Sequence, residues 1–220
     1  MKKCVVIINP KSGQNLENDY VFEYQALLQK YDYETIVYFT SYAKHATEIV
    51  LNIEDADLVI SVGGDGTFNE VVNGNLKRKK RLLLTHIPVG TTNDIGSMFG
   101  YGKDPIENLK LALSGVEKGI DICTINNIPF VYVAGFGKFM NVPYETPRDL
   151  KSKFGHLAYV VEGAKSFINP TPLYKLKYKV DGKNYEGEYS FVLISNANRI
   201  AGFNNFHKDL LLYTKMHTYT

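Results

Sequence analysis

The sequence predicts an α/β protein, with a helix-covered parallel sheet in the first half of the chain and antiparallel strands in the second. Two observations support this fold class. Apolar runs rich in β-branched residues alternate with helical periodicity up to about residue 120. Beyond that point, strand-like runs separated by turn signals replace the helical pattern.

Continuous apolar runs in the first half are expected to be buried parallel strands, because a strand covered on both faces lacks polar alternation. The four runs span residues 4–8, 35–39, 58–62 and 82–87. Between the first three runs, apolar side chains at helical spacing predict helices that pack on the sheet. One stripe consists of Tyr20, Tyr24, Leu27, Leu28 and Tyr31, and the other of Ala43, Ala46, Val50 and Ile53.

The second half of the chain is dominated by strand signals. The runs span residues 120–125, 130–136, 173–180 and 185–195. Turns are expected at Asn126-Asn127 and at Asp181-Gly182, since an Asp-Gly pair between two such runs is a strong hairpin signal. A helix is expected over residues 156–167. We therefore expect a Rossmann-like α/β domain over residues 1–122 and an antiparallel β domain over residues 123–220.

Composition and charge limit the possible binding partners of the protein and the cellular compartment in which it is expected. The 220 residues carry a net charge of only +2, so attraction to an anionic membrane or a nucleic acid requires a local cluster of cations. The two cysteines, Cys4 and Cys123, stand in apolar strand-like runs, which suits reduced thiols better than a disulfide framework. No apolar run has the length of a signal peptide or a transmembrane helix. These features predict a cytoplasmic protein and argue against nucleic-acid binding.

Three of the four predicted parallel strands end in loops of unusual composition. In an open parallel sheet, ligands bind beyond the carboxyl ends of the strands, where loops lead into helices. The loops occupy residues 9–13, 63–67 and 88–94. For each loop alone, a turn or a helix cap is the alternative explanation. Three such loops at one edge of one sheet are less readily explained as independent caps, and together they predict a nucleotide site.

The second loop, Gly63-Gly64-Asp65-Gly66-Thr67, is the most informative. Glycines permit positive φ angles and let backbone N–H groups approach a phosphate without interference from a Cβ atom. The helix that follows would direct its positive end at the anion. A carboxylate in such a cradle would repel phosphates, so Asp65 suggests an intervening Mg²⁺ or a bound water. A tight turn capped by Asp65 or Thr67 is the alternative.

The third loop repeats this logic. Thr91 and Thr92 offer hydroxyl donors, and Asn93 and Asp94 offer polar groups at the start of another helix. An ordinary helix N-cap is the alternative. The sequence contains no Walker A motif and no Gly-x-Gly-x-x-Gly after a strand, so P-loop and dinucleotide-binding sites lose their main support.

The order of these loops resembles the diacylglycerol kinase catalytic domain family, and specifically the bacterial soluble lipid kinases, which are related to sphingosine and ceramide kinases. The matching segments are Asn9-Pro10-x-Ser12-Gly13, then Gly63-Gly64-Asp65-Gly66-Thr67 with Asn69-Glu70, and finally Gly90-Thr91-x-Asn93-Asp94. Together they are highly specific, and the resemblance extends from about residue 3 to residue 204. It implies a kinase that transfers the γ-phosphate of ATP to a lipid hydroxyl such as that of diacylglycerol.

Residue roles follow from the resemblance, position by position, with ATP and Mg²⁺ as the implied cofactors. Asp65, Asp94 and Asp121 match acidic positions that the family groups around Mg²⁺, and they are the implied catalytic and metal-binding residues. Without the resemblance, Asp121 would be read as part of a turn before a strand. The implied nucleotide contacts are Asn9, Pro10, Lys11, Ser12, Gly13, Thr40, Gly63, Gly64, Asp65, Gly66, Thr67, Phe68, Asn69, Glu70, Thr91 and Asn93.

The chain departs from the family pattern near its C-terminus. In the family, a closing segment completes the β-sandwich, returns to the first domain, and carries both the catalytic-base glutamate and an Asp-rich loop that holds a structural Mg²⁺. Residues 195–203 still resemble the family, whereas residues 210–220 do not, so we expect a truncated chain with an incomplete antiparallel β-sandwich. Exposed strand edges in such a domain invite pairing with another chain, which makes a homodimer one expectation.

The resemblance also implies a lipid substrate at the inner, cytosolic face of the membrane, reached by transient peripheral contact. Lys77-Arg78-Lys79-Lys80-Arg81 suits an anionic bilayer, although a solvated connection between helix and strand accounts for it somewhat better. Two other functions stay open. An NAD kinase shares the Gly-Gly-Asp-Gly-Thr loop but not the pattern of residues 90–94, and a catalytically inactive nucleotide-binding protein fits the lack of a closing segment.

Overall fold

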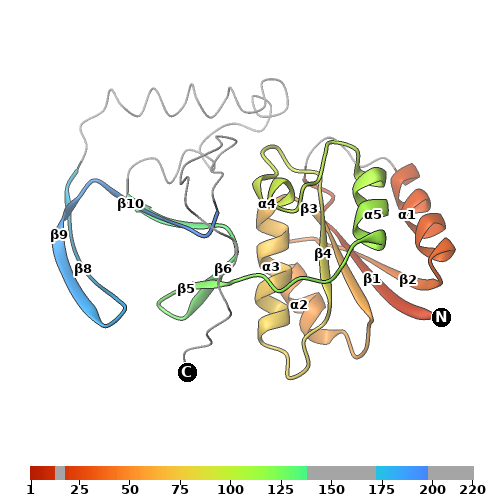
Figure 1. Ribbon diagram of the computed structural model, residues 1–220, viewed down its shortest axis with the longest axis horizontal. Coiled ribbons are helices and arrows are strands. Elements are labelled where there is room, and N and C mark those ends of the chain that lie inside the picture. Colours follow the sequence, from red (N-terminus) through yellow and green to blue (C-terminus); the bar gives the residue numbers. More distant parts are fainter. Residues whose placement is uncertain (13–17, 138–171, 198–220) are drawn as a thin grey trace. The chain divides into compact units, whose positions relative to one another are not determined.

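The computed structural model of the protein describes residues 1–12, 18–137 and 172–197. These residues form two compact units, whose elements are labelled in Figure 1. The first unit comprises Met1–Tyr132 together with Asn196 and Ala197, and the second lies within Val133–Ser195. The domain boundary predicted near residue 122 stays a prediction. In the described part of the chain, no helix combines the length and the apolar character needed to cross a bilayer.

A four-stranded parallel sheet forms the centre of the first unit. Its strands are β1 (Lys2–Ile8), β2 (Tyr33–Phe39), β3 (Leu58–Gly63) and β4 (Leu84–Pro88), in the order β2-β1-β3-β4. All neighbouring pairs are parallel, so the carboxyl ends of the strands lie at one edge of the sheet. The predicted α/β fold class is confirmed, and so are the four predicted parallel strands, although β4 begins at Leu84 rather than at residue 82. The predicted burial was wrong for β2, which lies at the edge of the sheet and contains no buried residue.

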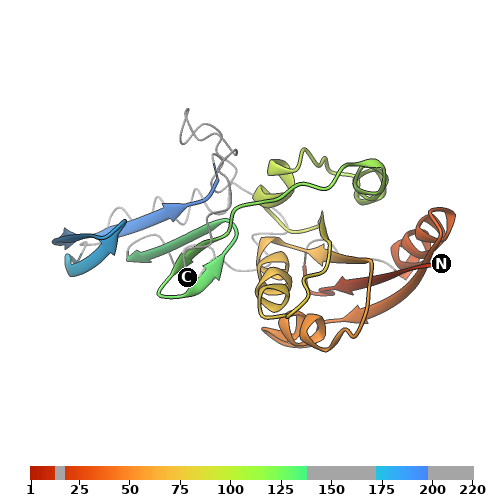
Figure 2. The ribbon, with the colours of Figure 1, turned by 60° about the horizontal axis from the view of Figure 1, so that its bottom comes forward.

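Helices cover both faces of this sheet, as Figures 1 and 2 show. One face carries α1 (Asn18–Lys30) and α5 (Pro105–Ser114), and the other carries α2 (His45–Asn52) and α3 (Asp65–Leu76). The short α4 (Asp94–Met98) follows β4 and shares a core cluster with α3. Each strand end at the carboxyl edge therefore leads into the N-terminal end of a helix.

β1 contributes to the core on both faces. Successive side chains of a strand point to opposite faces, so Val6 and Ile8 join the core beneath α1 and α5, whereas Val5 and Ile7 join the core beneath α2 and α3. Cys4 is also fully buried, and burial raises the pKa of its thiol to about 12, so the thiol is an unreactive part of the core. The continuous apolar sequence thus reflects a strand covered on both sides.

The apolar residues at the centre of each predicted helical stripe face the core, whereas those at one end of each stripe are exposed. Tyr24 and Leu28 of α1 are buried, whereas Tyr31 lies beyond the helix and is exposed. Val50 of α2 is buried, whereas Ala43 precedes that helix and is exposed. The helical period no longer applies where the backbone leaves helical geometry, so these end positions were wrongly assigned to the core.

A short β-hairpin of the first unit follows α5. β5 (Cys123–Ile125) pairs antiparallel with β6 (Ile128–Phe130). Asn126 and Asn127 form the predicted turn with φ angles of 50° and 63°. Positive φ at both central positions gives a two-residue turn the twist of its flanking strands, and Asn tolerates this conformation better than most residues.

The second unit contains two antiparallel strand pairs among its described residues. β7 (Val133–Gly137) pairs with β10 (Phe191–Ser195), and β8 (Tyr174–Val180) pairs with β9 (Lys183–Tyr189). The Asp181-Gly182 turn joins β8 to β9 with φ angles of 50° and 79°, which confirms the predicted hairpin. Antiparallel strands in the later region agree with the predicted fold class.

Two predicted strands are each divided in the structure. The run over residues 130–136 is split between β6 and β7, and the run over residues 185–195 is split at Ser190 between β9 and β10. Val131 and Tyr132 continue the apolar run through the first break, and a single serine marks the second, so hydrophobic pattern alone did not locate them. The helix predicted over residues 156–167 lies outside the described residues.

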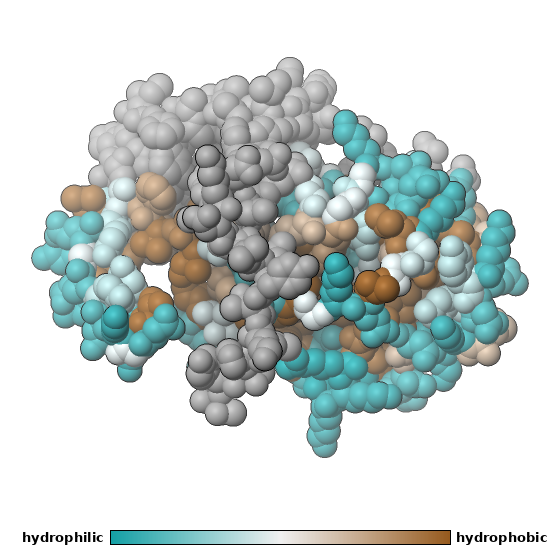
Figure 3. Space-filling view, in the orientation of Figure 1, coloured by the Kyte–Doolittle hydropathy of each residue, from teal (hydrophilic) through white to brown (hydrophobic). Residues whose placement is uncertain are grey.

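The hairpin of β8 and β9 separates aromatic from charged side chains by strand alternation. On one face, Tyr178 stacks on Tyr185 with ring centroids 5.2 Å apart. On the other, Lys177 pairs with Glu186 at 3.2 Å, and such an exposed pair contributes little to stability. Hydrophilic residues cover much of the visible described surface of the protein, with hydrophobic residues between them (Figure 3).

His86 is a fully buried, titratable side chain of β4. It stacks on Phe68 of α3 with ring centroids 4.9 Å apart, and its Nδ1 atom lies 3.2 Å from the carbonyl oxygen of Ser61. Within the described chain its Nε2 atom has no hydrogen-bond partner. Burial lowers the pKa of His86 from 6.5 to about 4, and the hydrogen bond to Ser61 only partly opposes this effect.

Acid is therefore expected to destabilise the first unit through His86. The unfolded chain protonates this residue near pH 6.5 and the folded chain only near pH 4, so stability falls as the pH decreases through that window. We expect His86 to account for a loss of about 2 kcal/mol in the free energy of unfolding between pH 7 and pH 5. Urea unfolding of the wild type and of His86→Leu at both pH values measures this contribution. An equal pH dependence in the two proteins would contradict it.

Candidate functional site

The loops after β1 and β3 are in contact at the carboxyl edge of the sheet. The Nδ2 atom of Asn9 donates a hydrogen bond to the Oγ1 of Thr67 at 3.1 Å, and the N–H of Gly64 donates to the Oγ of Ser12 at 3.3 Å. Asn9 is itself held, because its Oδ1 accepts from the N–H of Lys11 at 3.0 Å. Polar side chains of the first loop thus secure the glycine-rich loop and the start of α3.

The loop after β4 meets the glycine-rich loop from the other side. The N–H of Val89 donates to the carbonyl oxygen of Gly63 at 2.8 Å. A Cβ atom at Gly90 would lie 2.7 Å from the Cα of Gly64, so the two backbones approach too closely for a larger residue. The Nδ2 of Asn93 donates to the carbonyl oxygen of Gly90 at 2.9 Å and holds the third loop in shape. All three predicted loops therefore meet at one edge.

Asp65 joins the glycine-rich loop to α4. Its carboxylate oxygens accept hydrogen bonds from the N–H groups of Asp94 and Ile95 at 3.1 and 3.0 Å. Asn93, at the N-cap position of α4, makes no side-chain cap, so Asp65 takes that role from a distant part of the sequence. A carboxylate is favourable there because it satisfies N–H groups that lack helical partners and neutralises the positive end of the helix. No motif in the sequence indicated this tie.

Asp94 is buried, and Tyr132 holds its carboxylate. The Tyr132 hydroxyl donates to the Oδ2 of Asp94 at 2.6 Å, which is a short, charge-assisted hydrogen bond. Asp94 is only 1% exposed, so the surrounding protein and the hydrogen bond from Tyr132 set the orientation of its side chain. Tyr132 was not among the predicted site residues. It stands in an apolar strand-like run, and no spacing there distinguishes a site residue from a core residue.

The glycines of the second loop provide close approach and open space, not positive φ, which corrects the prediction. Gly63, Gly64 and Gly66 are absent from the residues with positive φ. A Cβ at Gly63 would lie 2.5 Å from the Oγ1 of Thr67, so local packing requires glycine. A Cβ at Gly66 would meet no atom within 4 Å. The first turn of α3 is thus open at Gly66, and this agrees with the predicted phosphate cradle without testing it.

Three predicted nucleotide contacts use their side chains inside the protein. Phe68 is buried in the core between α3 and α4. The Oδ1 of Asn69 accepts from the N–H of Val131 at 3.2 Å, and the Oε1 of Glu70 accepts from the N–H of Lys44 at 2.9 Å. These contacts position α3 against its neighbours. The predicted direct contacts of the three residues with a nucleotide stay predictions.

Other predicted contacts lie at the same edge. Thr40, directly after β2, is 9% exposed, and its N–H donates to the carbonyl oxygen of Ile8 at 2.8 Å. Gly13 lies outside the described residues. The exposed members of the predicted set in these loops include Pro10, Lys11 and Thr91. The loop after β2 therefore adds a fourth segment to the edge.

Asp65 and Asp94 lie together, whereas the structure holds Asp121 through its backbone. The Nδ2 of Asn196 donates to the carbonyl oxygen of Asp121 at 2.7 Å. Among residues 1–12, 18–137 and 172–197, no three His, Cys, Asp or Glu side chains form a group that could hold a metal. Mg²⁺ often takes one or two carboxylates together with phosphate oxygens and waters, so the Asp65 and Asp94 pair suits a metal that arrives with phosphates. The metal role of Asp121 stays a prediction.

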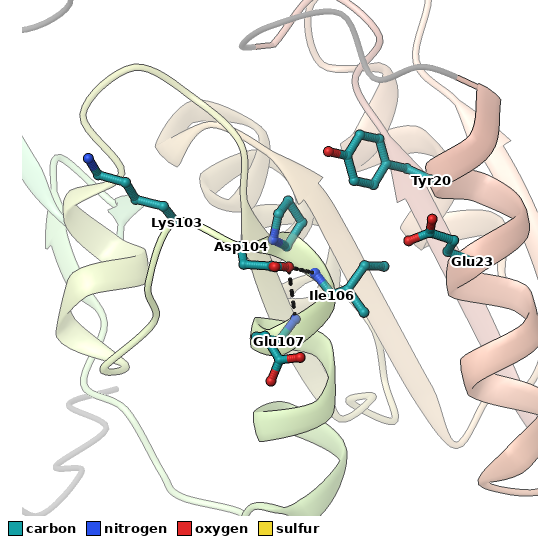
Figure 4. Close-up of a pocket in the computed structure, with 7 residues that line it drawn as sticks. Tyr20, Glu23, Lys103, Asp104, Ile106 and Glu107 are labelled. Carbon is teal, nitrogen blue, oxygen red and sulfur yellow. Dashed lines mark hydrogen bonds between the residues drawn. The ribbon is translucent and has the colours of Figure 1, made fainter.

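A separate hollow of about 660 Å³ opens between the N-terminal ends of α1 and α5 (Figure 4). The Asp104 carboxylate beside it accepts from the N–H groups of Ile106 and Glu107 at 2.8 and 3.1 Å, and so caps α5. The lining residues are Tyr20, Glu23, Lys103, Asp104, Pro105, Ile106 and Glu107. Three carboxylates and a single cation do not suit a triphosphate, so we place the candidate site at the glycine-rich loop instead.

The parallel sheet and its converging strand-end loops are typical of a nucleotide-binding protein, and comparisons with known proteins identify the family. The family model described as the diacylglycerol kinase catalytic domain matches residues 3–125. A relative in Bacillus subtilis (strain 168), named diacylglycerol kinase, is 34% identical over 214 residues, which cover 95% of this chain and 70% of the relative. A relative of the same name in Staphylococcus aureus (strain JH9) is also 34% identical over 214 residues, which cover 96% of this chain and 67% of the relative.

A solved structure agrees with these relatives. The crystal structure of a diacylglycerol kinase from Bacillus anthracis str. Sterne superposes with a TM-score of 0.74 and 26% sequence identity, covering 93% of this chain and 68% of that one. The chain therefore belongs to the diacylglycerol kinase catalytic domain family. This confirms the resemblance that the three loops indicated.

Alanine at two glycines is expected to have different effects on stability. In Gly66→Ala the new Cβ enters open space and alanine favours the helix, so the free energy of unfolding should stay the same or rise by up to about 1 kcal/mol. In Gly63→Ala the Cβ would meet Thr67, and a loss of about 1–3 kcal/mol is expected. Thermal unfolding of both variants beside the wild type measures the difference. Equal melting temperatures for the two variants would show that the loop is packed differently.

Proposed function

We propose that this protein is an ATP-dependent lipid kinase that transfers the γ-phosphate of ATP to a lipid hydroxyl, such as that of diacylglycerol. The observation that carries the proposal is the convergence of three strand-end loops around an open helix N-terminus, in a chain of this family. The lipid class comes from the relatives in Bacillus subtilis and Staphylococcus aureus, which are named diacylglycerol kinase.

The open space at Gly66 would receive phosphate oxygens. Backbone N–H groups at the start of α3 and the dipole of that helix favour negative charge there. Lys11 and Thr91 are exposed in the neighbouring loops and would add a cation and a hydroxyl donor. Asp65 and Asp94 would hold Mg²⁺. When bound, Mg²⁺ would neutralise charge on the transferring phosphoryl group, which together with positioning is most of what phosphoryl transfer requires.

The protein orients both carboxylates without help from a ligand. Asp65 is fixed by the amides of α4, and Asp94 is fixed by the hydroxyl of Tyr132. Groups that are already in place need no reorganisation when charge develops during a reaction. An ordinary helix cap would explain Asp65 but not a dedicated hydroxyl partner for the adjacent buried carboxylate. This combination favours a catalytic role over the simple capping alternative.

Transfer of labelled phosphate tests the proposal and separates it from its alternatives. The protein is incubated with Mg²⁺, ATP labelled at the γ position, and either diacylglycerol in phospholipid vesicles or NAD. We expect label in the organic phase. Label on NAD would identify an NAD kinase, and binding of ATP without transfer to either acceptor would identify an inactive nucleotide-binding protein.

Asp65→Asn should abolish lipid phosphorylation, with a loss of at least about 100-fold in the rate. The amide would also replace one acceptor of the α4 N–H groups by a donor, which costs about 1–3 kcal/mol of stability. Asp104→Asn is the matched control, because Asp104 caps α5 through two N–H groups in the same way but lies at the separate hollow. Similar losses of transfer in both variants would assign the effect of Asp65 to capping alone.

We also propose that the protein meets its lipid substrate by transient peripheral contact with the inner face of the membrane. The basic run is a poor candidate for that contact. Arg78 is engaged, because its Nη1 donates to the carbonyl oxygens of Val50 and Ile53 at 2.8 and 2.6 Å. The run follows the C-terminal end of α3, so it lies at the opposite edge of the sheet from the glycine-rich loop. We therefore assign the contact to a different surface.

Charge reversal in the basic run tests this assignment. Lys79→Glu combined with Lys80→Glu should leave the rate of transfer to vesicle-borne diacylglycerol within about twofold of the wild type, because the run is not assigned to the bilayer contact. If both cations were in contact, at about 1 kcal/mol each, losing them would weaken vesicle binding roughly 30-fold. Cosedimentation with anionic vesicles provides a second measurement. A loss of both vesicle binding and phosphate transfer would show that the basic run makes the membrane contact after all.

A further inference from the structure

Two aromatic rings stack in the connection between β2 and α2, at the carboxyl edge of the sheet. The ring centroids of Tyr42 and His45 are 4.4 Å apart, and the ring planes are 14° from parallel. Neither residue is among the predicted nucleotide contacts. Thr40, which is a predicted contact, lies two residues before Tyr42. We call Tyr42 and His45 the aromatic ledge.

Hydrogen bonds hold both rings of the aromatic ledge. The Tyr42 hydroxyl donates to the Oε2 of Glu48 at 2.6 Å, and the N–H of Ser41 donates to the Nδ1 of His45 at 3.1 Å. Because Nδ1 accepts, the neutral imidazole carries its proton on Nε2. A side chain that is already ordered loses less rotamer freedom when a ligand binds against it. The ledge is therefore prepared to receive a flat ligand.

Tyr42 is exposed in spite of this ordering. Its exposed fraction is 55%, although one face of its ring lies against His45. A single exposed aromatic residue is common on a protein surface and needs no explanation. A ring that is exposed, stacked and hydrogen-bonded at the edge where parallel sheets bind ligands is better explained as a binding surface.

The backbone between the two rings is strained. Lys44 has a φ angle of 68°, in the left-handed region, which is unfavourable for a residue other than glycine. Its N–H donates to the Oε1 of Glu70 at 2.9 Å, and the hydroxyl of Thr47 donates to the carbonyl oxygen of Glu70 at 2.8 Å. Strained residues persist where the surroundings fix them, and they are concentrated at ligand sites. These contacts also attach the ledge to α3.

The attachment to Glu70 places the aromatic ledge near the open end of α3. Glu70 follows Asp65 by five residues in this helix, and a rise of about 1.5 Å per residue puts it roughly 7–8 Å from the helix start. An extended nucleoside triphosphate separates its base from its terminal phosphate by more than this distance. A nucleotide with phosphates at Gly66 can thus bring its base to the ledge.

We infer that the outer face of Tyr42 is the surface on which the base of the nucleoside triphosphate stacks, with His45 supporting the tyrosine from behind. This inference rests on the proposed use of ATP and adds a base-binding subsite to the phosphate loops. Stacking depends on the flat face that every base presents, so the aromatic ledge contributes affinity and has little influence on which base is chosen.

Binding measurements on the whole chain test this subsite without reference to activity. Titration calorimetry with ATP and, separately, with inorganic tripolyphosphate compares a ligand that has a base with one that lacks it. Tyr42→Ala should weaken ATP binding about tenfold, the size expected for one stacked base, and leave tripolyphosphate binding unchanged. Tyr42→Phe keeps the ring and loses only the bond to Glu48, so a smaller loss of about twofold is expected.

Tyr31→Ala is the matched control, because Tyr31 is also exposed but follows the C-terminal end of α1, away from the carboxyl edge. It should bind both ligands like the wild type. Unchanged ATP binding in Tyr42→Ala, or an equal loss for ATP and tripolyphosphate, would overturn the stacking inference while leaving the proposed kinase intact. Failure of the wild type to bind ATP at all would overturn both.

Discussion

The tie between Asp65 and the start of α4 is the interaction on which the candidate site depends. Asp65 begins one helix and caps another, so a single carboxylate fixes the glycine-rich loop relative to the loop after β4. The same tie brings Asp94 next to Asp65, and Tyr132 then holds the Asp94 carboxylate. Hydrogen bonds thus fix the side chains of two acidic residues from neighbouring loops.

Close backbone packing is the second constraint on the site. The backbones of Gly90 and Gly64 are so close that a Cβ atom would not fit at position 90. A Cβ atom at Gly63 would likewise collide with the side chain of Thr67. Gly66 differs, because a Cβ added there would meet no atom within 4 Å. The contrast separates glycines that the local packing requires from one that the packing does not require. All of these contacts lie within Met1–Tyr132, so the candidate site at the carboxyl edge belongs to one compact unit.

Sequence reasoning located this site better than it described how the site is held. The loops could be predicted to meet because parallel strands bring their carboxyl ends to one edge. The positive φ expected of the glycines was wrong, since glycine composition does not distinguish a left-handed turn from a close approach. The contact of Glu70 with a nucleotide stays a prediction, and no spacing rule encodes the hydrogen bond that its carboxylate accepts from the N–H of Lys44.

The sequence by itself determined the four parallel strands, the glycine-rich loops and the family, because apolar periodicity and short motifs are local properties of the chain. Tertiary structure alone decided the partners of the long-range polar pairs, such as Asp65 with the amides of α4 and Tyr132 with Asp94. These pairs join residues that are distant along the chain. These hydrogen bonds form only when the helices pack on the sheet at the right distance, to within a fraction of a hydrogen-bond length. The local sequence pattern contains no information about that distance.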